Sequence, residues 1–297
     1  MRIGILLSFD RYRGFAGAER IKEEIVQAGH EAVELVEEQL SFSQEGATVT
    51  ARYQGTEIGE LACIIARPNF VEEPTLHVFA YEFLRLAGYE VLNGGTAALF
   101  VKNKLMQRAK LVEEGIATPR FATAFSPELA LAAAERIGYP VVAKLSFGAI
   151  GKGVFFARDR QTLSPIVDYL AIRDGNPMII EEFIEEATEG DLRVFVVGGE
   201  VIASMWRKAT EGELRNNAHL GGVTSVVRIT AEERALALAS TKALGLDIAG
   251  VDILRSKNGP LIMEVNANPG FEALEAVSGV NVAKAIVDYA ISRSTTM

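Results

Sequence analysis

Three oxygen-bearing side chains interrupt two apolar segments near the C-terminal end of the chain. Asp252 lies in the segment 250–254, and Glu264 and Asn266 lie in the segment 260–266. A glycine-containing turn separates the two segments, which predicts an antiparallel pair of strands. Carboxylate and amide oxygens together favour a hard cation that also binds substrate phosphates, as Mg²⁺ does. The competing interpretation, a solvated sheet face with incidental polar residues, fits less well with carboxylates inside apolar strands.

The length of the turn decides whether the three side chains face the same way. Glu264 and Asn266 are two residues apart, so on a strand they share one face. A two-residue turn at 258–259 would place Asp252 on the other face, whereas a three-residue loop at 257–259 would place it opposite Glu264. We therefore predict an odd-length loop or an equivalent β-bulge.

A second pattern suits phosphate binding. Lys144 lies near the end of the apolar segment 141–145, and the glycine-rich segment 148–153 follows. An ammonium group supplies charge to phosphate oxygens, and a glycine loop supplies backbone N–H donors. The order of residues matches neither the Gly-x-x-x-x-Gly-Lys-Ser/Thr loop nor the protein kinases. Taken alone, it is as typical of an ordinary hairpin with an incidental lysine.

Two more polar segments are candidates for nucleotide contacts. The extended segment 178–184 would present backbone groups to an adenine edge, with a following carboxylate for ribose hydroxyls. The segment 206–222 is rich in cations and amides, which clamp transferring phosphoryl oxygens in many enzymes. The simpler interpretations are two strands with acidic ends and a polar surface loop.

The elements that must position these residues follow from periodicity and capping. The first third of the chain alternates strand and helix, which predicts a small parallel α/β domain. The expected strands are 2–8, 32–36 and 61–67, and the expected helices are 16–28, 74–87, 127–137 and 231–244. A hairpin that turns at Gln54–Gly55 is interpreted as an edge insertion. Ser126 and the capping pair Thr230 and Glu233 mark the starts of the last two helices.

Composition narrows the class of protein. The 297 residues are 49% apolar and carry 30 basic and 39 acidic side chains, for a net charge of -9. This acidic balance argues against broad nucleic-acid binding, because phosphate neutralisation needs a basic surface. No apolar run approaches the ~18 residues of a membrane span, and the first apolar run is too short for a signal peptide. The single cysteine, Cys63, is expected in a buried strand.

Together these segments resemble the ATP-grasp ligases, and specifically the RimK-like α-L-glutamate ligases. The resemblance covers nearly the whole chain and is densest from 179 to 283. Four motifs in the family's order and spacing carry it: Gly-Asp191-Leu-Arg193, Arg215-Asn-Asn217-x-His219-x-Gly-Gly222, Gly-Val-Asp252-Ile-Leu and Met-Glu264-Val-Asn266-x-x-Pro-Gly270.

The resemblance implies an α/β (α+β) architecture: an ATP-grasp fold preceded by a parallel α/β pre-ATP-grasp domain. It divides the chain into an N-terminal domain at 1–95, a central lobe with the glycine loop at 96–180, and a C-terminal lobe with the metal site at 181–297. A nucleotide is expected between the two lobes.

The resemblance also assigns roles to individual residues. Expected ATP contacts are Lys104, Lys144, the adenine hinge Glu182-Phe183, the ribose contact Asp191 and the phosphate-binding stretch Arg215, Asn216 and Asn217. Expected ligands of two Mg²⁺ ions, which Mn²⁺ can replace, are Asp252, Glu264 and Asn266. Arg207 is expected near the acyl phosphate, and Arg207, Arg215 and Asn217 form the expected catalytic set.

The implied activity is that of an ADP-forming carboxylate–amine ligase. It would add L-glutamate to a protein C-terminus or to a glutamyl-ended small molecule, since the loop 266–275 resembles the glutamate-adding branch. Addition of another amino acid to an amino-group carrier protein or a cofactor is the alternative within the same chemistry. Lys208 and Leu220 depart from the ribosomal-protein-modifying enzymes, which leaves the acceptor open.

Two alternatives belong to other classes of protein. One is a phosphotransferase that stops at phosphorylation, and the other is a nucleotide-binding module without turnover. The intact set of candidate ligands and cations argues against the second. We expect a cytosolic enzyme that forms a homo-oligomer and binds neither nucleic acid nor membrane.

Overall fold

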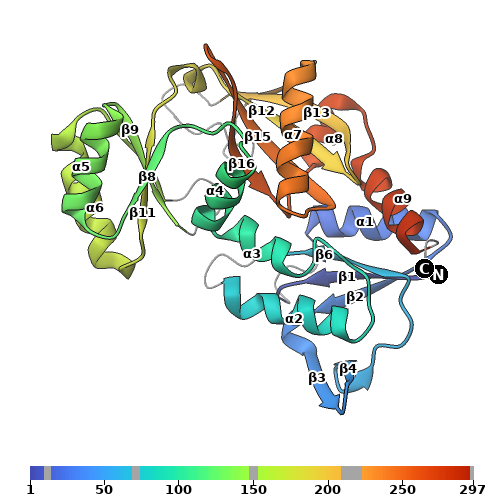
Figure 1. Ribbon diagram of the computed structural model, residues 1–297. Helices are drawn as coiled ribbons and strands as arrows, with labels where there is room; N and C mark the ends of the chain where they lie inside the picture. The colour runs from blue at the N-terminus through green and yellow to red at the C-terminus, as the bar shows by residue number, and fades with distance from the viewer. Residues whose placement is uncertain (10–14, 69–73, 147–152, 209–222, 295–297) are drawn as a thin grey trace.

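A parallel sheet forms the N-terminal part of the chain, as the alternation of strand and helix predicts (Figure 1). The computed structural model describes residues 1–9, 15–68, 74–146, 153–208 and 223–294. The strands lie in the order β2–β1–β6–β7, with bounds β1 Arg2–Leu7, β2 Glu31–Val36, β6 Cys63–Arg67 and β7 Val91–Leu92. Helices α1 (Ala16–Gln27) and α2 (Pro74–Leu86) lie close to the predicted positions, and Cys63 is buried in β6.

A small antiparallel sheet extends this domain. It contains β3 (Leu40–Glu45), β4 (Thr48–Tyr53) and β5 (Thr56–Glu57), after a short 3₁₀ turn at Glu37–Gln39. The predicted hairpin turn at Gln54–Gly55 is confirmed, and both residues have the positive φ angles, 52° and 82°, that such a two-residue turn requires. Strand β3 was not predicted from the sequence. Phe42 on this strand packs against Phe83 of α2, with ring centroids 5.3 Å apart.

The central lobe is an antiparallel sheet backed by two helices. Its strands lie in the order β10–β9–β11–β8, with bounds β8 Phe121–Ala124, β9 Val141–Leu145, β10 Val154–Ala157 and β11 Met178–Glu182. The backing helices are α5 (Pro127–Ile137), which has the predicted Ser126 cap, and α6 (Arg160–Asp174), which was not predicted. In Figure 1 this lobe projects away from the rest of the molecule. The boundary predicted at residue 180 falls inside β11, which belongs to this sheet.

The C-terminal lobe is built on a second antiparallel sheet. Its strands lie in the order β14–β13–β12–β15–β16, with bounds β12 Asp191–Val197, β13 Glu200–Lys208, β14 Val223–Val226, β15 Ile248–Ser256 and β16 Gly259–Asn266. A 3₁₀ turn, Glu185–Thr188, precedes β12. Helix α7 (Ala231–Ala243) begins with the predicted capping box of Thr230 and Glu233. It covers the face that carries Leu192, Val194 and Val251. Alternate residues, including Asp191, Arg193 and Asp252, therefore point to the opposite face.

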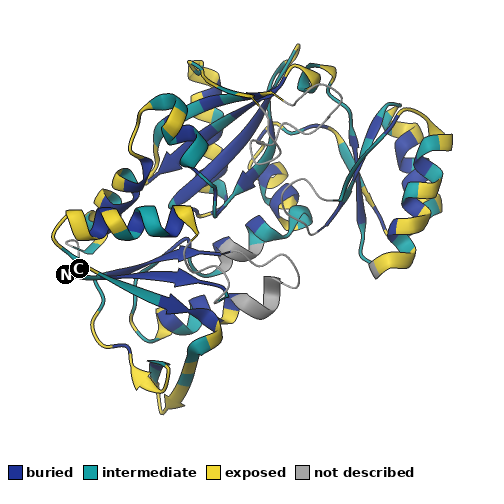
Figure 2. Ribbon diagram, turned by 180° about the vertical axis from the view of Figure 1, so that it is seen from behind, coloured by how far each residue is buried: buried dark blue, intermediate teal, exposed yellow. Residues whose placement is uncertain are grey.

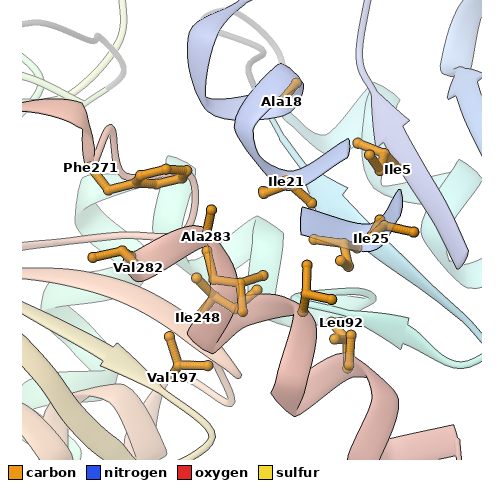
Figure 3. Packing of buried hydrophobic residues seen from close by; sticks show 14 of the residues in the cluster. Ile5, Ala18, Ile21, Ile25, Leu92, Val197, Ile248, Phe271, Val282 and Ala283 are labelled. Carbon is orange, nitrogen blue, oxygen red and sulfur yellow. The ribbon is translucent and has the colours of Figure 1, made fainter. Parts of the chain in front are cut away.

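One hydrophobic core joins the N-terminal domain to the C-terminal sheet. Figure 3 shows Ile5 and Ile21 of the N-terminal domain in the same cluster as Val197, Ile248 and Phe271. The last helices, α8 (Glu272–Ser278) and α9 (Val282–Ser294), contribute to this cluster, and α9 packs on α1. Figure 2 shows that buried residues line the inner faces of these layers, while the outer helix faces are exposed. The predicted domain boundaries remain predictions.

Asn93 connects the two parts by hydrogen bonds. It is completely buried and has a positive φ of 58°. Its amide donates to the carbonyls of Ile248 (2.6 Å) and Ala267 (2.8 Å) and accepts from the N–H groups of Asp247 and Ile248 at 2.8 Å each. The contact with Ala267 fixes the residue that directly follows the candidate metal ligand Asn266.

We expect Asn93→Ala to lower the free energy of unfolding by roughly 3–5 kcal/mol, because it removes four buried side-chain hydrogen bonds at once. Gln54→Ala is the matched control, since Gln54 also has a positive φ but is exposed. Its effect should stay within about 1 kcal/mol. Urea unfolding measures both, and equal effects would show that the backbone conformation, not the hydrogen bonds, sets the cost.

Among the described residues, no helix is both long enough and apolar enough to span a membrane.

Candidate active site

A β-bulge brings the candidate metal ligands to one face of the C-terminal sheet. Ser256 pairs with Gly259, so the turn between β15 and β16 has two residues and the odd-length loop is absent. The pairing shifts by one position after Asp252, which leaves Met263 as the extra residue and sets Asp252 opposite Glu264. The predicted bulge is therefore confirmed. Glu264 and Asn266 are two residues apart on β16, so their side chains lie on the same face as Asp252.

Two arginines hold the carboxylate of Asp252. Arg193 is its register partner on β12 and binds it with two hydrogen bonds, of which that from Nη2 to Oδ2 is 2.9 Å long. Arg207 on β13 reaches the same carboxylate, with Nη2 2.8 Å from Oδ1. Arg207 also donates to both oxygens of its register partner Asp191, at 2.7 and 2.9 Å. Two buried carboxylates thus share the charge of two guanidinium groups.

This charge balance keeps the candidate ligands ionised. Burial alone would raise the pKa of Asp252, but Arg193 and Arg207 outweigh it and lower that pKa below its ordinary value. Burial likewise opposes ionisation of Glu264, whose pKa the nearby Lys104 lowers. Asp191 differs, because burial and the charge of Asp252 raise its pKa to about 6 against the effect of Arg207. Ionised carboxylates are the form that binds a cation.

Two lysines lie near this cluster, one on helix α4 (Lys104–Glu113) and the other on the central-lobe strand β9. Lys104 is the first residue of α4, and its Nζ lies 2.8 Å from Oε1 of Glu264. Asn103 caps α4 by accepting hydrogen bonds from two N–H groups of its first turn. Lys144 on β9 forms an ion pair with the buried Glu181 on β11. The structure therefore places both predicted phosphate lysines beside carboxylates at the junction of the lobes.

The predicted adenine hinge lies at the end of β11. The Glu182 carboxylate accepts hydrogen bonds from the backbone N–H of Arg120 (2.8 Å) and from its Nε (2.7 Å). The Phe183 N–H donates to the carbonyl of Pro140 at 3.2 Å. The Phe183 ring meets that of Phe156 edge to face, with centroids 4.8 Å apart. The segment is thus held rigidly at the edge of the central lobe, where the prediction places the base.

The structure brings most of the predicted site together. Asp191, Arg207, Asp252, Glu264 and Asn266 lie on one sheet face, and Lys104 adjoins them. The predicted residues Arg215, Asn216 and Asn217 lie outside the described residues, as does the part 148–152 of the glycine-rich segment. The individual roles, including the ribose contact assigned to Asp191, stay predictions.

Three residues of the site were given no role from the sequence. Arg193 could have been recognised, because it lies two residues after Asp191 on a strand and so shares its face. Glu181 carried a weaker signal, as an acidic residue inside the apolar run of β11. Arg108 on α4 carried none, because a cation on a helix usually faces solvent.

The donor set fits a hard divalent cation. Within the described residues no three His, Cys, Asp or Glu side chains form a metal-binding group. The third oxygen here belongs instead to the amide of Asn266, whose Nδ2 lies 3.4 Å from Oδ2 of Asp252. The Oδ1 of Asn268, two residues further on, is buried and has no hydrogen-bond partner among the described residues. A buried oxygen without a donor is an acceptor for a cation or its bound water.

Comparison with known proteins identifies the family of this chain. The model of the RimK-like ATP-grasp domain matches residues 101–290. A ribosomal protein bS6–L-glutamate ligase of Escherichia coli O7:K1 is 34% identical over 299 aligned positions, which cover 100% of this chain and 97% of the relative.

Solved structures share the fold at lower identity. A RimK domain ATP-grasp protein from Sphaerobacter thermophilus superposes with a TM-score of 0.76 at 22% identity, over 97% of this chain and 99% of that protein. The ATP-grasp ligase PsnB, solved with a minimal precursor, Mg and ADP, gives a TM-score of 0.74 at 19% identity, over 99% of this chain and 98% of PsnB. Full-length similarity to the first relative and the family match across most of the chain place this protein in the RimK-like ATP-grasp ligase family.

Proposed function

We propose that this enzyme uses ATP and Mg²⁺ to join L-glutamate, through its amine, to the carboxylate of a protein terminus or of a glutamyl-ended small molecule. The bulge that sets Asp252 opposite Glu264 is the observation that carries the proposal, because it gathers carboxylates and arginines on one sheet face. The glutamate ligase from Escherichia coli supports the choice of amino acid. PsnB supports a peptide acceptor, since one structure contains a precursor peptide, and supports both cofactors, since another contains Mg and ADP.

The proposed reaction has two steps. An oxygen of the acceptor carboxylate attacks the γ-phosphorus of ATP, and the bond from that phosphorus to the β,γ-bridging oxygen breaks, giving ADP and an acyl phosphate. The amine of glutamate then attacks the acyl carbon, loses a proton, and expels phosphate with the former carboxylate oxygen. Negative charge builds on the transferred phosphoryl oxygens, and preorganised cations are the groups that stabilise it.

The chain's own residues would divide this work by position. Lys104 and Lys144 bind phosphate oxygens, and the hinge at Glu182–Phe183 holds the base. Arg207 is oriented by Asp191 and directs its guanidinium at the transferring group. Asp252, Glu264 and Asn266 would hold two Mg²⁺ ions, for which Mn²⁺ can substitute. Bound there, the metal supplies Lewis-acid neutralisation of phosphate charge.

The test is phosphate release from purified enzyme with MgATP and a panel of amino acids, each with and without glutamyl-ended peptides, with products analysed by mass. We expect release only when an amino acid and an acceptor are both present. Glutamate should give a product heavier by one glutamyl unit or by a series of them. ADP formation with an acceptor alone, together with a stable phosphorylated product and no free phosphate, would indicate a phosphotransferase. Dependence on a different amino acid would overturn the choice of glutamate and leave the ligase chemistry intact.

A further inference from the structure

Helix α4 clamps the metal-ligating strand β16 from its free side. β16 is the last strand of its sheet, so one row of its backbone groups has no strand partner there. The side-chain amide of Gln107 forms hydrogen bonds with both backbone groups of Val265: it accepts from the N–H and donates to the carbonyl, at 2.9 Å each. The guanidinium of Arg108 donates to the carbonyls of Ile262 and Met263, also at 2.9 Å each. These contacts surround Glu264 and include the bulge residue Met263.

Arg108 also reaches into the central lobe. Its Nη2 donates to Oε1 of Glu181 on β11, and the other oxygen of Glu181 pairs with Nζ of Lys144 on β9. All three side chains are largely buried, with exposed side-chain fractions of 6% for Arg108, 4% for Glu181 and 12% for Lys144. One line of contacts therefore runs from the bulge of β16, through Arg108 and Glu181, to the predicted phosphate lysine. Figure 1 shows α4 between β16 and the central lobe.

We propose that Arg108 and Glu181 are positioning residues that set the Lys144 ammonium relative to the metal-ligating edge of β16. The proposal rests on the assignment of Lys144 to nucleotide phosphate. The guanidinium of Arg108 binds two carbonyls beside Glu264 and one oxygen of Glu181. One planar group therefore contacts both the metal-ligating strand β16 and the counterion of Lys144. The distance between Lys144 and the metal ligands is then built into the fold before nucleotide binds.

The same triad controls the charge of Lys144. Burial lowers the pKa of Lys144, Glu181 raises it, Arg108 lowers it and the more distant Glu264 raises it. Loss of Glu181 alone would leave two buried cations together, whereas loss of Arg108 alone would leave Lys144 with an unshared counterion. These two changes should therefore shift the protonation of Lys144 in opposite directions. If Arg108 and Glu181 had only a structural role, removing either would not shift the protonation of Lys144 in opposite directions.

The experiment measures the dissociation constant of MgADP between pH 7 and 10 by calorimetry, for the wild type and for Arg108→Met, Glu181→Gln, the double variant and Lys144→Met. Affinity should fall at alkaline pH as Lys144 loses its proton. Glu181→Gln should move that fall to lower pH and weaken binding at pH 8 by about tenfold. Arg108→Met should move the fall in affinity to higher pH. In the double variant, the pH of this fall should return towards the wild-type value. Lys110→Met is the control, because among the described residues Lys110 pairs only with Glu113 and Glu114 on the outer side of the same helix. It should not change the pH at which affinity falls.

The outcomes separate this inference from the proposed function. Failure of the wild type to bind MgADP would overturn the proposed function, and an unchanged affinity in Lys144→Met would overturn the role of Lys144. If both behave as expected, shifts of the same sign in Arg108→Met and Glu181→Gln would contradict the positioning triad. So would a double variant that binds or folds no better than the worse single variant.

Discussion

Glu264→Gln is expected to abolish turnover, with a loss of at least about 10³-fold in kcat, while the fold remains intact. The amide keeps the shape of the side chain and a hydrogen bond with Lys104 but removes the negative charge that we propose binds Mg²⁺. Because Glu264 lies at the surface of the cluster and not in the apolar core, unfolding temperature should change by only a few degrees. Initial rates of phosphate release under saturating substrates measure the effect.

Glu113→Gln is the matched control for this variant. Glu113 lies at the exposed end of α4 and, within the described part of the chain, pairs only with Lys110, so the same chemical change there should leave the rate unaltered. A fully active Glu264→Gln enzyme would remove Glu264 from the metal site. An inactive variant that has also lost its circular dichroism spectrum would instead assign a structural role to the pair of Lys104 and Glu264.

The second large effect is expected at Arg207. Arg207→Ala should lower kcat by roughly 10²–10³-fold while the KM for ATP changes less than about threefold, because in the proposed mechanism the guanidinium stabilises charge that develops during transfer. Separate determination of kcat and KM distinguishes this role from simple nucleotide binding. Equal losses in nucleotide affinity and in rate would refute it.

Removal of Arg207 also leaves Asp191 and Asp252 close together without a shared cation, which can cost about 3–5 kcal/mol of stability. Arg207→Lys keeps the positive charge and loses the forked hydrogen bonds to Asp191, so it separates the two effects. We expect this variant to fold normally and still to lose most of its kcat. Activity like that of the wild type would show that charge alone suffices at this position.

The strand pattern of the C-terminal lobe predicted which candidate metal ligands share a sheet face. Alternation along β16 placed Glu264 and Asn266 on one face, and that requirement led to a predicted bulge, which the structure has at Met263. The capping pair Thr230 and Glu233 predicted the start of α7 for a similarly local reason. Features with a short repeat or a fixed spacing can be predicted in this way because neighbours in sequence determine them.

The long-range contacts could not be predicted. Arg108 and Glu181 are 73 residues apart and meet only because α4 crosses between the lobes. Asn93 satisfies backbone groups 154 and 174 residues away, which no local pattern reveals. The helix α6 could not be predicted because its sequence contains Pro165, which disfavours a helix interior, and its apolar residues do not form a clear stripe. Such features depend on the packing of whole elements and not on the residues nearby in sequence.

The central claim is that a carboxylate oxygen passes to phosphate before the amide forms. The most direct measurement uses an acceptor labelled with ¹⁸O in both carboxylate oxygens, with MgATP and glutamate, and determines the mass of the released phosphate. The account predicts one ¹⁸O atom in each phosphate for every amide bond made. Amide formation with unlabelled phosphate would contradict an acyl phosphate, and phosphate release without amide formation would contradict the ligase.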